Sequence, residues 1–180
     1  MINTDGNKLI KKKPSQRVVS YLREIVLMLL LTGARKREVL DARWEQLDFE
    51  KKIWVIPITK AGRPRTVPLS EALLTTLERI KTTSTRPWLF PSPRTGLPFR
   101  NIFHSWNVAR KKAGLAEVRI HDLRHSFASF LVNAGRSLYE VQQLLGHADL
   151  KTTQRYAHLN QDTLREATET AVAAIRTVIF

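Results

Sequence analysis

The sequence contains no cysteine, and its 180 residues include only seven glycines, eight prolines and three tyrosines. Without cysteine there are neither disulfide bonds nor thiolate metal ligands, which is typical of a reducing compartment. The scarcity of glycine and proline excludes collagen-like and low-complexity chains. A hydrophobic share of 43% is sufficient for one globular domain with a sizeable core.

Long hydrophobic runs are also missing. The longest apolar run, residues 25–31, is far shorter than the roughly 20 residues of a membrane-spanning helix. The first 16 residues, MINTDGNKLIKKKPSQ, have no apolar stretch after their charges and therefore do not resemble a signal peptide. We expect residues 1–16 to be a basic, flexible segment, and we expect a cytoplasmic protein without a membrane partner.

Acidic residues are few beside basic ones: 16 Asp and Glu stand against 30 Lys and Arg, a net charge of +14. A field of this sign attracts polyanions, of which nucleic acid is the commonest protein partner. A lipid surface is less favoured, because the sequence shows no basic amphipathic helix with an aromatic face. The charge therefore predicts nucleic-acid binding that weakens steeply with salt.

Hydrophobic periodicity predicts an α+β domain over residues 17–180, mainly helical, with a small antiparallel sheet of three strands near its N-terminal part. The expected helices cover residues 18–31, 36–42, 70–81, 100–113, 122–134, 138–145, 152–157 and 163–178. The expected strands cover residues 53–58 and 65–69, joined by a hairpin turn at KAGRP, with a third strand within residues 43–49. Glycines 33, 114, 135 and 146 follow helix ends, and Ser137 with Glu140 forms a capping box.

Histidines and an arginine gather at the start of one expected helix. His121 and Arg124 share a face at this N-terminus, where free N–H groups attract anions. The alternative is a capping histidine beside a salt-bridged arginine. His121 and His125 also have the spacing of a helical metal-binding pair, but zinc would need a third ligand, and Asp122 stands where a catalytic glutamate is usual.

Arg35 lies at a junction between a loop and a helix, from which its side chain could point into a cleft. It could equally be a surface arginine paired with Glu38 or Asp41. If the helix continued, Glu38, Asp41 and Glu45 would share one face, as the carboxylates of a magnesium-dependent nuclease do. A solvated acidic face is the commoner explanation.

Two further residues have side chains suited to catalysis. Lys60 lies at the expected hairpin tip, where a flexible cation can reach a bound groove and donate a proton, or simply protect an edge strand. Tyr156 has polar flanks, and its phenol, with a pKa near 10, needs cations or a base nearby to act as a nucleophile. His147 could be such a neighbour, and an anchoring role for Tyr156 in the core remains the alternative.

Four strings in this order, LTGARKREVL, TKAGRPRTVPL, HDLRHSFASFLVNAG and LLGHADLKTTQRYAHL, resemble the catalytic domain of the tyrosine recombinase (phage integrase) family. The resemblance implies the DNA breaking-rejoining fold of that family. It also implies a site-specific DNA recombinase that cleaves and rejoins double-stranded DNA through a covalent 3′-phosphotyrosine, without metal or cofactor. A DNA-binding module that lacks catalysis, and an enzyme like type IB topoisomerase, are the alternatives.

The resemblance also assigns residue roles. Tyr156 is the expected nucleophile, and His121 the expected acid and base for its phenol. Arg35 and Arg124 would clamp the non-bridging phosphate oxygens, Lys60 would protonate the leaving 5′-oxygen, and His147 would hydrogen-bond the phosphate. We expect three more residues to bind DNA: Lys36, Arg63 and Arg65.

Further expectations concern the assembly and the extent of the chain. Family members act as homotetramers on paired DNA sites, so we expect this assembly on DNA, with a monomer possible in its absence. The helix at residues 163–178 is expected to dock on a neighbouring protomer or on its own domain. An N-terminal DNA-binding domain is missing, which suggests a fragment of a bacterial or phage-encoded, nucleoid-associated protein.

Overall fold

The computed structural model of the protein describes residues 21–57, 64–82, 85–147, 149 and 151–157. Its helices are α1 (Leu22–Thr32), α2 (Lys36–Leu40), η1 (Trp44–Gln46), α3 (Glu71–Lys81), α4 (Phe103–Lys112), α5 (Asp122–Asn133), α6 (Leu138–Leu145) and α7 (Lys151–Gln154). Its strands are β1 (Leu47–Asp48), β2 (Ile53–Ile56) and β3 (Arg65–Pro68). The predicted fold class, mainly helical with a three-stranded antiparallel sheet, is confirmed. The expected N-terminal segment, the KAGRP turn with Lys60 and Arg63, and the expected helix at residues 163–178 lie outside the described residues.

Helix α1 is central to the fold and packs against α2, α3 and α5. Ile25, Met28 and Leu29 form its buried stripe, at the i, i+3, i+4 spacing of one helical face. Gly33 ends the helix in the left-handed conformation, with φ of 61°. A Cβ atom at Gly33 would lie 2.4 Å from Cδ1 of Phe127, so glycine also permits the close approach of α5.

The sheet has the order β1-β2-β3 and is antiparallel throughout, with Leu47 opposite Trp54 and Trp54 opposite Val67. The sequence predicts the third strand within residues 43–49, but only two of those residues pair as β1. The 3₁₀ turn η1 occupies three other residues of that segment, Trp44–Gln46. The side-chain oxygen of Gln46 accepts hydrogen bonds from the Arg43 N–H at 3.1 Å and from Nε1 of Trp54 at 3.3 Å, which holds the turn against β2.

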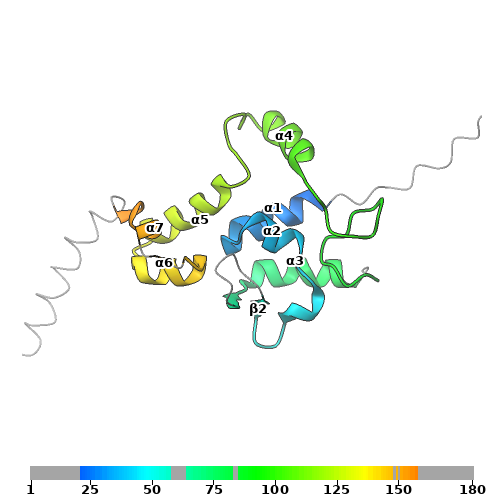
Figure 1. The fold of residues 1–180 in the computed structure, drawn as a ribbon, viewed down its shortest axis with the longest axis horizontal. Helices are drawn as coiled ribbons and strands as arrows, with labels where there is room; N and C mark the ends of the chain where they lie inside the picture. The colour runs from blue at the N-terminus through cyan, green and yellow to red at the C-terminus, as the bar shows by residue number, and fades with distance from the viewer. Residues whose placement is uncertain (1–20, 58–63, 83–84, 148, 150, 158–180) are drawn as a thin grey trace, which may run out of the picture.

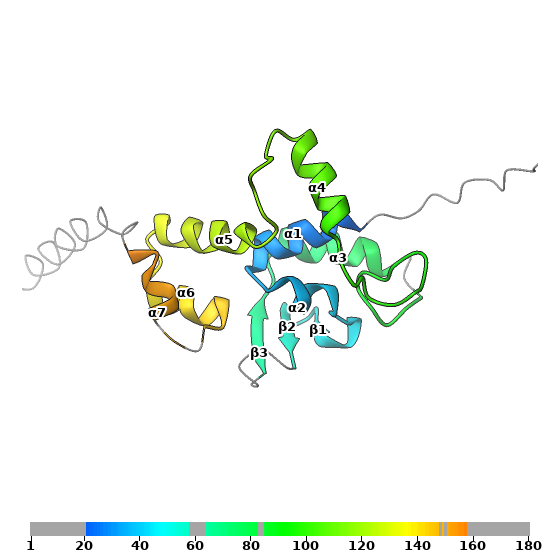
Figure 2. The same ribbon diagram turned by 45° about the horizontal axis from the view of Figure 1, so that its top comes forward.

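Helix α4 stands apart from the sheet in both views (Figures 1 and 2). It begins at Phe103, three residues later than predicted, and the Asn101 side chain accepts a 2.9 Å hydrogen bond from the Phe103 N–H in a turn just before the helix. Trp106 attaches the helix to the core: its ring is buried, and its Nε1 donates to the carbonyl of Val118 at 3.2 Å.

Two hydrophobic clusters build the interior. The larger one joins α1, α2, α3 and the sheet and includes Leu123 at the start of α5. The smaller one lies between α5, α6 and the segment after α7, and its buried members are Ala128, Val132, Val141, Leu145 and Tyr156. Helix α5 therefore contributes to both clusters. In the part of the chain that the structure describes, no helix has the length and apolar character needed to cross a membrane.

Candidate active site

The predicted catalytic residues that the structure describes lie at or next to the ends of several helices. Arg35 is the N-cap residue of α2, and Arg124 lies in the first turn of α5. His147 directly follows Gly146, which ends α6 in the left-handed conformation, and Tyr156 follows α7. Each of these four side chains therefore lies at or next to the end of a helix.

Arg124 is the buried cation of the site, with an exposed fraction of 4%. Its Nη1 donates to the carbonyl of Gly33 at 2.6 Å, and its Nη2 donates to the carbonyl of Leu145 at 2.8 Å. Both carbonyls lie at helix C-termini, where oxygens lack intrahelical partners and attract positive charge. Burial lowers the pKa of Arg124 to about 10, with the charges of Arg35 and Arg65 acting in the same direction, so the guanidinium is still charged at neutral pH.

Glu38 connects two further arginines. Its carboxylate accepts hydrogen bonds from Nη1 of Arg35 at 2.9 Å and from Nη2 of Arg65 at 2.8 Å. It also accepts the N–H of Arg35 at 2.8 Å, the contact of a helix-capping glutamate. Burial alone would raise the pKa of Glu38, but the charge of Arg65 and the Arg35 N–H outweigh it, and the pKa lies below its ordinary value. Glu38 is therefore ionised and orients both guanidinium groups.

Arg65 supports the bend after α6. Its side chain is only 9% exposed, and its Nη1 donates to the carbonyl of Leu144 at 2.6 Å. Gly146 has φ of 65°, and a Cβ atom there would lie 2.5 Å from Cδ of Arg65. The Gly146 carbonyl in turn lies 3.4 Å from Nη2 of Arg35. These contacts fix the backbone from which His147 projects.

The ring and the carbonyl of His147 both make hydrogen bonds to nearby side chains. Its Nδ1 lies 2.9 Å from Oγ1 of the buried Thr153, and its carbonyl accepts a 3.3 Å hydrogen bond from Nε2 of Gln142. Burial lowers the pKa of His147 to about 4, and the charges of Arg124 and Arg35 add to this effect. The ring is therefore neutral at neutral pH, so in this state it can offer a hydrogen bond but no excess proton.

The phenol of Tyr156 is buried, with an exposed fraction of 5%, and its oxygen lies 2.6 Å from Nδ1 of His125. Burial raises the pKa of Tyr156, although the charges of Arg155 and Arg124 act to lower it. Burial and the charge of Arg155 also lower the pKa of His125. A protonated phenol therefore faces a neutral imidazole, and the tautomer of His125 decides which of the two donates the hydrogen bond.

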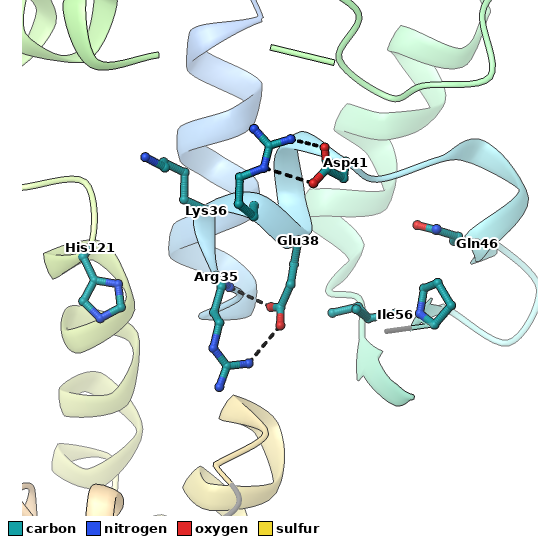
Figure 3. Close-up of a pocket in the computed structure, with 9 residues that line it drawn as sticks. Arg35, Lys36, Glu38, Asp41, Gln46, Ile56 and His121 are labelled. Carbon is teal, nitrogen blue, oxygen red and sulfur yellow. Dashed lines mark hydrogen bonds and ion pairs between the residues drawn. The ribbon is translucent and has the colours of Figure 1, made fainter. Parts of the chain in front are cut away.

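His121 and Arg35 line one pocket of about 650 Å³ (Figure 3). Arg35 extends from the start of α2 toward the end of α6, while His121 faces the pocket from the start of α5. Lys36 lies on the wall of the same pocket. The imidazole of His121 meets that of His125 edge-on, with ring centroids 5.0 Å apart, and burial together with His125 lowers the pKa of His121. The pocket thus presents cationic and neutral hydrogen-bond donors, and the two carboxylates that also line it, Glu38 and Asp41, are paired with arginines.

The structure brings five of the six predicted catalytic residues together in one region: Arg35, His121, Arg124, His147 and Tyr156. Of the three residues predicted to bind DNA, Lys36 lines the pocket and Arg65 points inward onto Glu38 and Leu144, so a DNA contact by either stays a prediction. The structure does not describe the other two predicted residues, Lys60 and Arg63.

Sequence reasoning missed two members of the site. It considers Glu38 as an ion-pair partner of Arg35 or as part of an acidic face, but not as the link to Arg65, which is distant in sequence. It treats His125 only as half of a metal pair, although the spacing from His121 does place both rings on one face. Within the described ranges, no three His, Cys, Asp or Glu side chains come together as a metal site, and the carboxylates of Glu38 and Asp41 are bound to arginines. The nuclease hypothesis therefore gains no support there.

Comparisons with known proteins bear on the family and the fold of the chain. The profile described as "Phage integrase family" matches residues 4–163. Tyrosine recombinase XerA of Pyrococcus furiosus is 35% identical over 170 residues, covering 91% of this chain and 58% of the relative. The catalytic domain of bacteriophage HP1 integrase superposes with a TM-score of 0.64 at 28% identity, covering 83% of this chain and 81% of that domain.

A second solved structure, the XerH site-specific recombinase bound to difH substrate, has a TM-score of 0.67 at 26% identity, covering 81% of this chain and 45% of that one. The chain spans a little over half the length of the curated XerA relative. The chain belongs to the phage integrase family, the tyrosine recombinases.

Proposed function

We propose that this chain contains the catalytic centre of a site-specific DNA recombinase, which cleaves and rejoins double-stranded DNA through a covalent 3′-phosphotyrosine. Tyr156 is the nucleophile, and its oxygen forms a bond to phosphorus as the bond from phosphorus to the 5′-oxygen breaks. The phosphodiester energy is kept in the protein–DNA bond and is available for rejoining. The attack needs neither an external energy source nor a cofactor.

The observation that carries the proposal is the arrangement of Arg35, Arg124 and His147 beside the buried phenol. Two guanidinium groups can hold the non-bridging oxygens as negative charge builds on the phosphate, and neutral His147 can add a hydrogen bond. His121 faces the same pocket as Arg35. Lys60, on the predicted hairpin tip, completes the set as the acid that protonates the leaving 5′-oxygen.

Covalent capture tests this function on a mixture of DNA sequences, so the target site does not have to be chosen in advance. The protein is incubated in EDTA with a pool of duplexes that carry randomised sequence and a nick on one strand. A nick beside the cleaved bond lets the short 5′-hydroxyl fragment diffuse away, so the phosphotyrosine adduct accumulates. Adducts that resist denaturation are isolated, and the attached DNA is sequenced.

We expect adducts enriched in one sequence from the unaltered protein and none from Tyr156→Phe, which keeps the ring and removes the nucleophilic oxygen. Cutting that occurs only with magnesium and survives Tyr156→Phe would contradict the proposal. DNA binding without any adduct would favour a non-catalytic DNA-binding module. The affinity of the protein for the same DNA should fall steeply between low and physiological salt. An affinity that does not change with salt would contradict the expectation drawn from the net charge.

The assembly belongs to the same proposal. A homotetramer on paired DNA sites would place four copies of Tyr156 for sequential strand exchange, with residues 163–178 docking on a neighbouring protomer. Mass measurement of the protein with and without two bound sites separates this assembly from a monomer.

A further inference from the structure

We propose that His125, in place of His121, accepts the phenolic proton of Tyr156 when the tyrosine attacks, and returns that proton when the DNA is rejoined. This inference rests on the proposed function and adds a catalytic residue to it. It starts from the contact between Nδ1 of His125 and the phenolic oxygen, which are 2.6 Å apart. A general base must lie within hydrogen-bond reach of the proton it removes, and His125 meets this condition before DNA is bound.

The other two histidines of the site are engaged elsewhere in the described residues. Nδ1 of His147 lies 2.9 Å from the hydroxyl of Thr153. His121 faces the pocket that contains Arg35, and its ring lies edge-on against His125. His121 is therefore suited to hold the His125 ring in place, whereas His125 contacts the reacting oxygen itself.

The protonation states agree with this geometry. Neutral imidazole has one N–H nitrogen and one acceptor nitrogen. A hydrogen bond from the phenol to Nδ1 therefore requires the ring proton to be on Nε2. Burial and the charge of Arg155 favour the neutral ring of His125, and burial of Tyr156 favours the protonated phenol. At neutral pH the proton therefore lies on the phenol of Tyr156 and the ring of His125 is neutral. These are the starting states from which the phenolic proton can move to His125.

Charge and atoms balance along the step. The Tyr156 oxygen forms a bond to phosphorus while its proton moves to Nδ1 of His125, which becomes an imidazolium. The bond from phosphorus to the 5′-oxygen breaks, and that oxygen takes a proton from the acid, assigned above to Lys60. In rejoining, the 5′-hydroxyl returns its proton to the same acid as its oxygen attacks phosphorus, the bond from phosphorus to the Tyr156 oxygen breaks, and the imidazolium protonates the departing phenolate.

The groups around His125 come from three segments. They are Arg119 before α5; His121, Asp122 and Arg124 at the start of α5; and Arg155 and Tyr156 after α7. The carboxylate of Asp122 raises the pKa of His125, whereas the three arginines and burial lower it. Asp122 therefore stabilises the imidazolium that the step creates, and the arginines make it a stronger acid for the return of the proton.

A matched pair of variants separates proton acceptance from mere positioning. His125→Asn puts an amide close to the place of Nδ1, so it can still accept a hydrogen bond from Tyr156 but cannot take the proton. His121→Asn is the control on the neighbouring position. With nicked DNA selected in the capture experiment, we expect the rate of adduct formation to fall by about 10²–10⁴-fold in His125→Asn, the range for loss of a general base. The loss in His121→Asn should be much smaller.

The pH profile is the second readout. In the unaltered protein the rate should decline on the acid side of a pKa below 6.5, as His125 becomes protonated and can no longer accept. That decline should be absent from His125→Asn. An Asn variant with a nearly normal rate and an unchanged acid limb would overturn the proposal, as would a larger loss in His121→Asn than in His125→Asn.

A spectroscopic measurement keeps this proposal separate from the recombinase activity. Imidazole ¹⁵N spectra of the DNA-free chain should show Nδ1 of His125 unprotonated and Nε2 protonated at neutral pH. Tyr156→Phe removes a hydrogen bond to the neutral ring, so the pKa of His125 should rise. A proton on Nδ1, or no change in Tyr156→Phe, would refute the assignment even if adducts form. If no adduct forms, the proposed function fails, and these spectra still decide whether the pair exists.

Discussion

Nη2 of Arg65 donates a 2.8 Å hydrogen bond to the carboxylate of Glu38, across 27 positions of sequence. Both side chains are largely buried, with exposed fractions of 9% for Arg65 and 7% for Glu38. The pair joins strand β3 to helix α2, and through Arg35 it reaches the centre of the candidate site. Its loss should therefore affect both folding and catalysis.

Arg65→Ala is expected to lower the free energy of unfolding by about 3 kcal/mol, because a buried carboxylate loses one of its two guanidinium partners. The matched control is Arg136→Ala, which breaks an ion pair with Glu140 whose two side chains are 62% and 49% exposed. That change should cost no more than about 0.5 kcal/mol. Urea unfolding of both variants checks the difference, and equal losses would show that burial of the Glu38 pair has no special effect.

Gly146 and Gly114 give a second matched comparison. Both have positive φ, 65° and 73°, so alanine at either position carries backbone strain of about 1 kcal/mol. Only at Gly146 does the new Cβ meet Arg65, whereas nothing lies within 4 Å of a Cβ at Gly114. We expect Gly146→Ala to be the more destabilising variant in thermal unfolding, and to slow cleavage by displacing His147. Equal melting temperatures would contradict this account of the bend.

Removal of either guanidinium should impair strand cleavage. We expect Arg35→Ala and Arg124→Ala each to reduce the adduct formation rate by on the order of 10²–10³-fold, as for loss of a donor to a developing oxyanion. Arg124→Ala should also be less stable, because the Gly33 and Leu145 carbonyls lose their donor. Rate measurements with saturating DNA, well below the melting temperature, separate the two effects. Cleavage at a nearly normal rate by either variant would refute its role.

Lys60 has a chemical test of its own. Lys60→Ala should slow cleavage of ordinary DNA, because an alkoxide is a poor leaving group without an acid. A substrate with sulfur at the 5′ position of the cleaved bond releases a thiolate, which needs no proton. This substrate should restore much of the rate to Lys60→Ala but not to Arg124→Ala. If the sulfur substrate gives no recovery, Lys60 is not the acid.

Stability should fall as the pH drops below 6.5. The pKa of His147 is lowered to about 4 in the folded protein, so between pH 6.5 and 4 the unfolded chain binds more protons than the folded one. The free energy of unfolding therefore rises with pH across this window and levels off above it. His147→Gln should flatten the slope in unfolding experiments at pH 5, 6 and 7. An unchanged slope would show that His147 titrates normally.

Local signals in the sequence were reliable guides to the helices. The ends of α1 and α6 follow from Gly33 and Gly146, and the start of α6 follows from Ser137 with Glu140, because each depends on contacts within a few residues. Strand β1 was overestimated, since the Gln46 side chain holds a 3₁₀ turn against Trp54, a contact that periodicity does not reveal.

The site was predictable as a set of residues but not as a network of contacts. The four strings point to the candidate side chains, because their order and spacing carry the family resemblance, and the catalytic roles of those side chains stay predictions. They gave no sign that Glu38 binds Arg65 or that Tyr156 meets His125, because those contacts depend on how β3, α2, α5 and α7 pack. His121 and His125 lie on the same helical face, and sequence spacing cannot decide which of them reaches a residue 31 positions beyond His125.

Arg35, Arg65 and Arg124 lie close enough to influence one another, while Glu38 supplies a single compensating charge. Folding therefore holds three guanidinium groups near one another, against the repulsion between their charges, before any ligand binds. If a DNA phosphate binds here, as proposed above, its negative charge would offset part of that repulsion, and the cations would not have to be gathered at the moment of binding.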